Sequence, residues 1–214
     1  MSATESVVLV HGLWLHGAAM GWMARRMAGY GYTVHRFSYP SVRMSMAENA
    51  HRLVAFCQGL GARRLHLVGH SLGGLLIARM LGESHTLDIG RVVLMGAPFV
   101  DSLAARRLSR ARFGRAAVGA SIAEWLNGAR PASLARYDIG VIAGNRGVGL
   151  GVMVAPDLPS PHDGTVSVAE TIVPGARDHI VLPVTHTQML MSIQVARQVC
   201  DYLQRGRFTQ GDAA

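Results

Sequence analysis

The basic residues of this 214-residue sequence include no lysine, because all 21 of them are arginines. A P-loop phosphate site, a pyridoxal Schiff base and a Ser-Lys dyad each need a lysine, so all three are excluded. Acidic residues are also few, 13 in all, which leaves a formal net charge of +8. No nucleic-acid-binding motif with interleaved aromatic residues accompanies this charge. We therefore interpret it as a solvated basic surface and expect no specific nucleic-acid partner.

Cysteine and metal-ligand patterns are scarce as well. Cys57 and Cys200 fall in helical patterns without metal-like spacing, so we expect packed thiols in a reducing, cytoplasmic compartment. His11 and His16 share a loop but lack a matching third ligand, and no His-Glu-x-x-His pattern occurs. The glycine cluster "GNRGVGLG" at 144–151 has no helical pattern after it, which disfavours a nucleotide-binding loop. We expect neither a metal nor another cofactor.

One uncharged stretch, 6–24, is nearly long enough to span a bilayer. The residues before it supply no positive charge for a signal peptide, and two His-Gly pairs interrupt it. We interpret it as a strand at 7–10, a loop at 11–16 and a helix whose methionines recur at core spacing. No transmembrane segment is expected here or elsewhere.

Apolar strands alternate with helical patterns along the rest of the chain. We expect strands at 32–40, 64–69, 91–99, 137–144 and 178–184, and helices at 46–60, 72–81 and 187–206. Such alternation implies right-handed crossovers and a mostly parallel sheet with helices on both faces, an α/β fold. The length suits a single domain, 1–214, and sites in such sheets gather at the carboxyl ends of the strands.

The stretch "RLHLVGHSLGGLLIARML", 64–81, places a serine between an apolar strand and an apolar helix. Gly69 and Gly73 allow the strand and helix to pack closely, while Ser71 between them takes a strained conformation. This G-x-S-x-G context is that of a nucleophile whose hydroxyl is exposed at the strand end. A chance match, with Ser71 only capping the helix, is the alternative.

A serine nucleophile needs a base and a group that orients the base. His186 in "PVTHTQML" follows an apolar strand and precedes the last helix, and Asp163 in "PHDGTVSV" lies on a glycine-containing turn. The order Ser71, Asp163, His186 is the one that a strand-turn-helix nucleophile requires. Asp101, directly after an apolar strand, and Asp178, at the start of another, are the competing acids.

Backbone N–H groups must stabilise the oxyanion of the tetrahedral intermediate. One candidate is Leu72, directly after the serine, and the other is Leu13 in "VLVHGLWLHG". The side chain of Trp14 would then border the acyl pocket. His70, next to the serine, is a second candidate for substrate binding.

The stretches "LVHGLW", "LVGHSLGG", "HDGTVSV" and "THTQML" resemble the oxyanion loop, nucleophile elbow, acid loop and histidine loop of the α/β-hydrolase family, in order. The short length resembles that of its small, nearly capless bacterial esterases and lipases. The resemblance implies Ser71 as nucleophile, His186 as base, Asp163 as orienting acid, and Leu13 and Leu72 as oxyanion donors. It implies cleavage of small-molecule carboxylic esters through an acyl-enzyme, by a monomer or weak homo-oligomer. The alternatives are a thioesterase or amidase on the same triad, or a catalytically silent binding protein.

Two features depart from the family pattern. The first loop lacks the "HGGG" form of some relatives, and the segment 101–128 is long enough for helices beside or partly over the site, as a small cap. A helix crowded with arginines suits the rim of a site better than the wall of an acyl tunnel, so we expect a preference for short to medium acyl esters. A solvated helix far from Ser71 is the alternative. The arginines are Arg106, Arg107, Arg110, Arg112 and Arg115.

Overall fold

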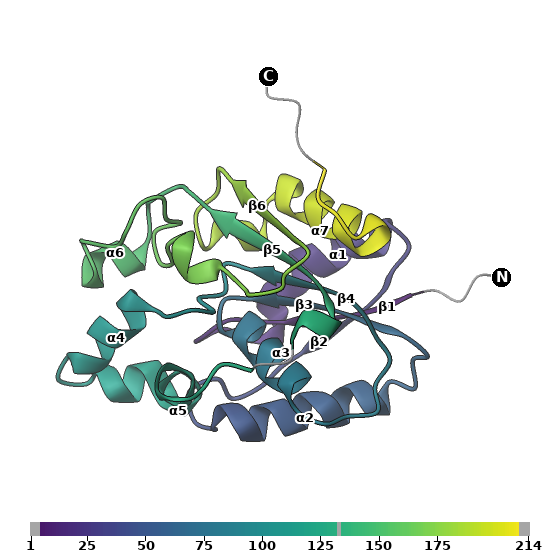
Figure 1. Ribbon diagram of the computed structural model, residues 1–214, viewed down its shortest axis with the longest axis horizontal. Helices are drawn as coiled ribbons and strands as arrows, with labels where there is room; N and C mark the ends of the chain where they lie inside the picture. Colours follow the sequence, from purple (N-terminus) through teal and green to yellow (C-terminus); the bar gives the residue numbers. More distant parts are fainter. Residues whose placement is uncertain (1–4, 132–133, 210–214) are drawn as a thin grey trace.

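Six strands form a parallel sheet in the computed structural model, which describes residues 5–131 and 134–209 (Figure 1). Their order across the sheet is β2-β1-β3-β4-β5-β6, and every neighbouring pair is parallel. The expected α/β architecture is confirmed. The strands are β1 (Ser6–Val10), β2 (Thr33–Phe37), β3 (Leu65–His70), β4 (Ile89–Met95), β5 (Asp138–Gly144) and β6 (Asp178–Leu182).

Helices cover both faces of the sheet (Figure 1). The α-helices are α1 (Gly21–Gly29), α2 (Met46–Gly59), α3 (Leu72–Gly82), α4 (Leu103–Arg110), α5 (Gly114–Asn127), α6 (Leu150–Val154) and α7 (Ile193–Arg205). Short 3₁₀ helices lie at η1 (Gly17–Met20), η2 (Leu134–Arg136), η3 (Ala169–Thr171) and η4 (Gln188–Leu190). Residues of α1 and α7 pack on one face, and residues of α2, α3 and α5 pack on the other.

Strand β1, which lies between β2 and β3, shows why an inner strand has an unbroken apolar sequence. Val8 and Val10 belong to the core beneath α2 and α3, whereas Val7 and Leu9 belong to the core beneath α1 and α7. Successive side chains of a strand point to opposite faces, and both faces are covered here. Each position of β1 must therefore be buried, as all of them are.

Two expectations about helices are wrong. The last helix begins at Ile193, not at 187, because Ser192 caps it by accepting a hydrogen bond from Val195 N–H, and η4 precedes it as a separate turn. A short helix, α6, also begins at Leu150, inside the glycine cluster at 144–151, and continues past it, where no helix was expected. Its five residues are too few for a clear periodicity in the sequence.

The two thiols lie in separate cores. Cys57 on α2 and Cys200 on α7 are both free and buried, so the expected packed thiols are confirmed. Burial raises the pKa of each thiol to about 12, which keeps both unreactive.

The uncharged stretch 6–24 folds as β1, a loop, η1 and the start of α1. No helix within the described residues has the length and apolar character needed to cross a membrane.

Candidate active site

The serine of the strand-to-helix turn has a strained backbone. Ser71 has φ 54° and ψ −124°, a region that residues with a side chain rarely adopt. Its N–H donates to the carbonyl of Met95 on the neighbouring strand at 2.9 Å. A Cβ on Gly69 would lie 2.7 Å from the carbonyl carbon of Gly73, and one on Gly73 would lie 2.3 Å from the carbonyl oxygen of Val10. Glycine is required at both positions because the backbones touch.

Asp163 and His186 form a hydrogen-bonded pair in which the carboxylate is buried. The Oδ2 of Asp163 lies 2.6 Å from Nδ1 of His186, and the carboxylate is only 1% exposed. Its Oδ1 accepts hydrogen bonds from the N–H groups of Thr165 at 2.9 Å and Val166 at 2.7 Å. With both oxygens engaged, the carboxylate favours the tautomer that carries the proton on Nδ1, which leaves Nε2 of the imidazole free to accept one.

Ser71 and His186 line the same pocket, which has a volume of about 280 Å³. Within the described part of the chain no hydrogen bond joins Ser71 Oγ to His186, and such bonds commonly tighten only when substrate binds. The volume lies at the small end of ligand pockets. Much of its wall is apolar, formed by side chains that include Leu108, Val118, Ile122, Val154, Val166 and Leu190.

The two candidate oxyanion donors lie at the same strand ends. Leu72 is the first residue of α3, where N–H groups have no partner inside the helix. Leu13 lies in the loop after β1 and also lines the pocket. Across residues 5–131 and 134–209, neither N–H donates a hydrogen bond to another protein group. Both can therefore be offered to a substrate oxygen.

Hydrogen bonds from His11 and Tyr39 stabilise the loop that carries Leu13. The Nδ1–H of buried His11 donates to the carbonyl of Gly12 at 2.8 Å, and the Tyr39 hydroxyl donates to the carbonyl of His11 at 2.9 Å. Burial lowers the pKa of His11, so the ring is neutral and suited to this packing.

No group of three or more His, Cys, Asp or Glu residues is placed to hold a metal among the described residues.

His70, expected at the substrate, makes its hydrogen bond to the histidine loop. Its Nε2–H donates to the carbonyl of His186 at 2.9 Å, and the two rings lie 4.7 Å apart. Burial lowers the pKa of His70 to about 3, with the neighbouring His186 as a second cause. The neutral ring lines the pocket and fixes the backbone on which His186 stands.

Trp14 is more than half exposed and lines the mouth of the pocket. Its backbone has φ +59°, and its indole N–H donates to the carbonyl of Ala117 on α5 at 2.8 Å. The loop after β1 is therefore tied to α5 across the pocket.

The segment 101–128 lies at the site, not far from it. Ala104, Ala105 and Leu108 of α4 line the same pocket as Ser71, so the alternative of a solvated helix far from Ser71 is wrong, and α4 contributes to the pocket wall, where the rim had been expected to suit it better. Positions 104, 105 and 108 share one face of a helix, which leaves the arginines on the other face. The arginine crowding concealed this apolar face, although its spacing is present in the sequence.

The competing carboxylates are engaged elsewhere. Asp101 accepts hydrogen bonds from Nε of Arg106 at 2.7 and 2.9 Å. Asp178 accepts from two backbone N–H groups at the opposite end of the sheet. Of the three candidate acids, the structure brings only Asp163 to His186.

Sequence reasoning missed Gly96, which follows β4 with φ +56°. A Cβ there would lie 3.1 Å from His186 Nδ1 and 3.2 Å from Asp163 Oδ2. A glycine directly after an apolar strand, in "LMGAP", was the available signal. It makes room for the Asp163–His186 pair.

Comparisons with known proteins identify a matching family and a shared fold. The model of the alpha/beta hydrolase family matches residues 7–202, and no curated protein matches the sequence. The mature form of lipase BlEst2 from Bacillus licheniformis is similar with a TM-score of 0.74 and 19% identity, over 96% of this chain and 93% of that one. The esterase EaEST from Exiguobacterium antarcticum has a TM-score of 0.65 and 15% identity, over 95% and 93%. A hydrolase from Pseudomonas aeruginosa PA01 has a TM-score of 0.64 and 16% identity, over 96% and 91%. At these identities the likeness shows a shared fold.

Proposed function

Since the chain belongs to the alpha/beta hydrolase family, we propose that it is a serine hydrolase that cleaves carboxylic esters through an acyl-enzyme. One observation carries the proposal: His186, paired with the buried carboxylate of Asp163, lines the same small pocket as Ser71, which lies on a strained turn. Strain of this kind is maintained where a fold over-determines the position of a functional group. The esterase and lipase names of structural neighbours support the same reaction class.

In the acylation step Ser71 Oγ attacks the ester carbonyl while Nε2 of His186 takes its proton. The N–H groups of Leu13 and Leu72 stabilise the resulting oxyanion, each contributing about 3 kcal/mol. His186 then gives the proton to the departing alkoxide, and the C–O bond to the alcohol breaks. Asp163 stabilises the imidazolium and holds its orientation throughout.

In the deacylation step a water molecule replaces the alcohol. His186 Nε2 takes a proton from water, the hydroxide attacks the acyl carbonyl, and the same two N–H groups stabilise the second oxyanion. Return of the proton to Ser71 Oγ releases the carboxylic acid. Every proton transfer uses one histidine, whose tautomer is set by Asp163.

The pocket favours short to medium acyl groups. Its volume of about 280 Å³ is below the usual 300–1,000 Å³ of drug-sized ligand sites. Ile122 and Leu190 are among the buried apolar side chains of its wall, which suit an alkyl chain.

A fluorophosphonate probe tests the assignment. It should add covalently to the protein, and peptide mapping should place the adduct on Ser71. A silent binding protein with this fold would not react. A panel of matched esters, thioesters and amides then separates an esterase from a thioesterase or amidase, and we expect the ester to have the highest kcat/KM.

A further inference from the structure

The helical hairpin formed by α4 and α5 concentrates positive charge. The segment 101–130 contains six of the 21 arginines but only two carboxylates. Two of these arginines, Arg106 and Arg107, pair with aspartates. Arg110, Arg112 and Arg115 are exposed and form no salt bridge to any described residue. Their charges are therefore not neutralised by a carboxylate within the described part of the chain.

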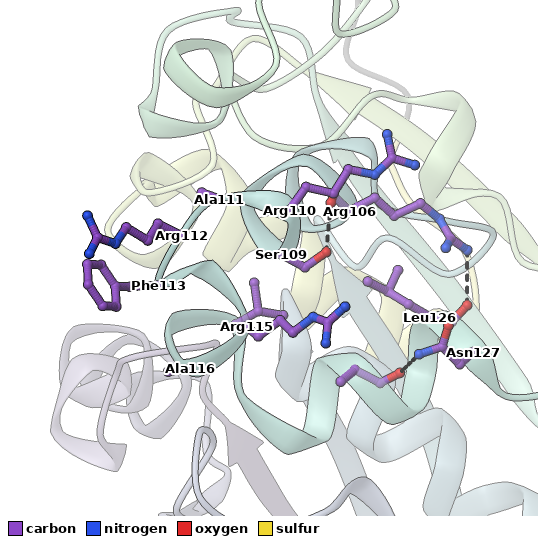
Figure 2. A pocket seen from close by; sticks show the side chains of 12 residues that line it. Arg106, Ser109, Arg110, Ala111, Arg112, Phe113, Arg115, Ala116, Leu126 and Asn127 are labelled. Carbon is purple, nitrogen blue, oxygen red and sulfur yellow. Dashed lines mark hydrogen bonds between the residues drawn. The ribbon is translucent and has the colours of Figure 1, made fainter.

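These arginines surround a hollow of about 1060 Å³ between α4 and α5 (Figure 2). Figure 2 shows Arg115 extending between the two helices and Arg112 lying beside Phe113 at the turn that joins them. Among the described residues, the lining of the hollow includes four arginines and no carboxylate. Guanidinium groups bind phosphate oxygens through paired N–H donors, so the hollow is suited to phosphate groups.

Large apolar side chains are exposed at the same end of the molecule. Phe113 at the turn is 75% exposed, and the guanidinium of Arg112 lies over its ring at 5.4 Å. On α6, Leu150 is 70% exposed and Met153 is 80% exposed. Figure 1 shows α4, α5 and α6 together at the end toward which the strands run, and α4 packs on α6. Large exposed apolar side chains thus lie on the hairpin that carries the arginines and on α6, the helix packed on α4, and such exposed apolar groups mark interaction surfaces.

We propose that this end of the molecule docks on an anionic lipid surface. Phe113 enters the acyl boundary, while Arg110, Arg112 and Arg115 bind the lipid phosphate groups. Basic residues beside exposed aromatic and aliphatic ones are what an anionic bilayer selects. A second copy of this chain is a poor occupant, because its own arginines would repel these. A purely polar polyanion would leave the exposed apolar side chains without a partner.

In the docked orientation the mouth of the Ser71 pocket would face the lipid. Trp14 and Leu150 line the pocket mouth and are exposed on this end, so the mouth would face the lipid. Apolar esters dissolved in the bilayer could then enter without crossing water. This last step rests on the proposed ester hydrolysis, whereas the docking itself does not.

Co-sedimentation with vesicles tests the docking without any catalytic readout. Vesicles of mixed phosphatidylglycerol and phosphatidylcholine should bind the protein at least about tenfold more tightly than vesicles of phosphatidylcholine alone. Each arginine near an anionic surface strengthens binding by about fivefold, so R110Q/R112Q/R115Q should weaken it by about 100-fold. F113A should weaken it by about tenfold or more. Raising the salt from about 0.1 M to 0.5 M should weaken wild-type binding, because it shortens the Debye length from about 10 Å.

Matched controls remove the same groups from the opposite end. R63Q/R205Q/R207Q deletes three exposed arginines near the start of β3 and the end of α7, and Y30A deletes an exposed aromatic side chain at the end of α1. Each control should change vesicle binding by less than about fivefold. Equal losses from both triple variants would show that net charge alone is responsible and would overturn the assignment.

Three other results would overturn it. These are equal binding to anionic and neutral vesicles, unchanged binding by R110Q/R112Q/R115Q, and release from vesicles by micromolar tripolyphosphate, which would indicate a site for a soluble polyanion. Equally tight binding to duplex DNA through the same arginines would assign the surface to nucleic acid instead. A protein that docks on anionic vesicles but hydrolyses no ester would contradict only the proposed function.

Discussion

Asp163 and His186 are joined twice, once through their side chains and once through the backbone. The carboxylate lies 2.6 Å from Nδ1 of the imidazole, and the N–H of His186 donates to the carbonyl of Asp163 at 2.9 Å. The loop that carries the acid therefore also holds the loop that carries the base. This double link fixes the direction of the imidazole ring before any substrate arrives.

Replacing Asp163 by Asn should lower kcat by about 10⁴-fold, because the amide no longer favours the imidazole tautomer that accepts the serine proton. The backbone link between the two loops should survive, so the melting temperature should change little. Asp101→Asn is the matched control, since Asp101 binds Arg106 and does not contact His186. A large loss of kcat in Asp101→Asn alone would transfer the acid role to that residue.

The glycines of the serine turn make a prediction about stability. A Cβ on Gly73 would lie 2.3 Å from the carbonyl oxygen of Val10, so Gly73→Ala must push α3 away from β1. We expect a loss of at least about 3 kcal/mol in the free energy of unfolding, the upper range for overpacking. Gly59→Ala, in the last turn of α2 with nothing within 4 Å, should stabilise the protein by about 0.5–1 kcal/mol. Urea unfolding of both variants measures the contrast, and similar values for the two would contradict the packing argument.

The lowered pKa of His70 implies that the folded protein becomes less stable in acid. Its pKa is lowered from 6.5 to about 3 in the folded protein, so between these pH values the unfolded chain binds the extra proton. Stability is then present above pH 6.5 and is lost as the pH falls, by up to about 1.4 kcal/mol per pH unit. Burial lowers the pKa of His11 and His66 in the same direction.

His70→Gln removes this titration while its amide can still donate to the carbonyl of His186. The free energy of unfolding of wild type minus that of the variant, measured in urea, should fall between pH 7.5 and pH 4.5 and can become negative. A signed difference that is constant or rises on acidification would show that His70 is not held neutral.

The wall of the pocket predicts acyl preference. For p-nitrophenyl esters from acetate to palmitate, kcat/KM should be highest at short to medium length and low at palmitate, because the pocket holds only about 280 Å³. Leu108→Ala removes an apolar wall residue and should raise kcat/KM for octanoate relative to acetate by about tenfold. Leu60→Ala, at the far end of α2, should leave this ratio unchanged. Palmitate hydrolysed faster than butyrate would refute the size argument.

The parallel sheet and the alternation of strands and helices along the chain were predictable from the sequence because burial on both faces requires continuous apolar strands, as β1 and β3 show. The order of the strands across the sheet was not predicted. The elbow also carried a local signal, since only glycine fits at Gly69 and Gly73. The start of α7 had no such signal, because the apolar residues of η4 continue the helical hydrophobic pattern toward the N-terminus. Only the helix cap at Ser192 marks the boundary.

Contacts between residues far apart in the sequence could not be predicted from local sequence patterns. Loop position favoured Asp163 over Asp101, but the contact with His186 depends on how two loops meet across 23 residues. The contact of His70 with the carbonyl of His186 spans 116 residues and has no local sequence signal. The apolar face of α4 that lines the pocket has helical spacing in the sequence, but the arginines between its residues led us to predict a helix that is cationic on most of its faces.

The role of Ser71 is the central claim, and the turnover of one ester by wild type and Ser71→Ala tests it most directly. Hydrolysis of p-nitrophenyl butyrate by both proteins, each shown to be folded by circular dichroism, gives the two values of kcat. Loss of the nucleophile of a cooperative triad costs about 10⁶-fold, so the variant should be indistinguishable from buffer. A folded Ser71→Ala protein that retains near-normal turnover would contradict the account.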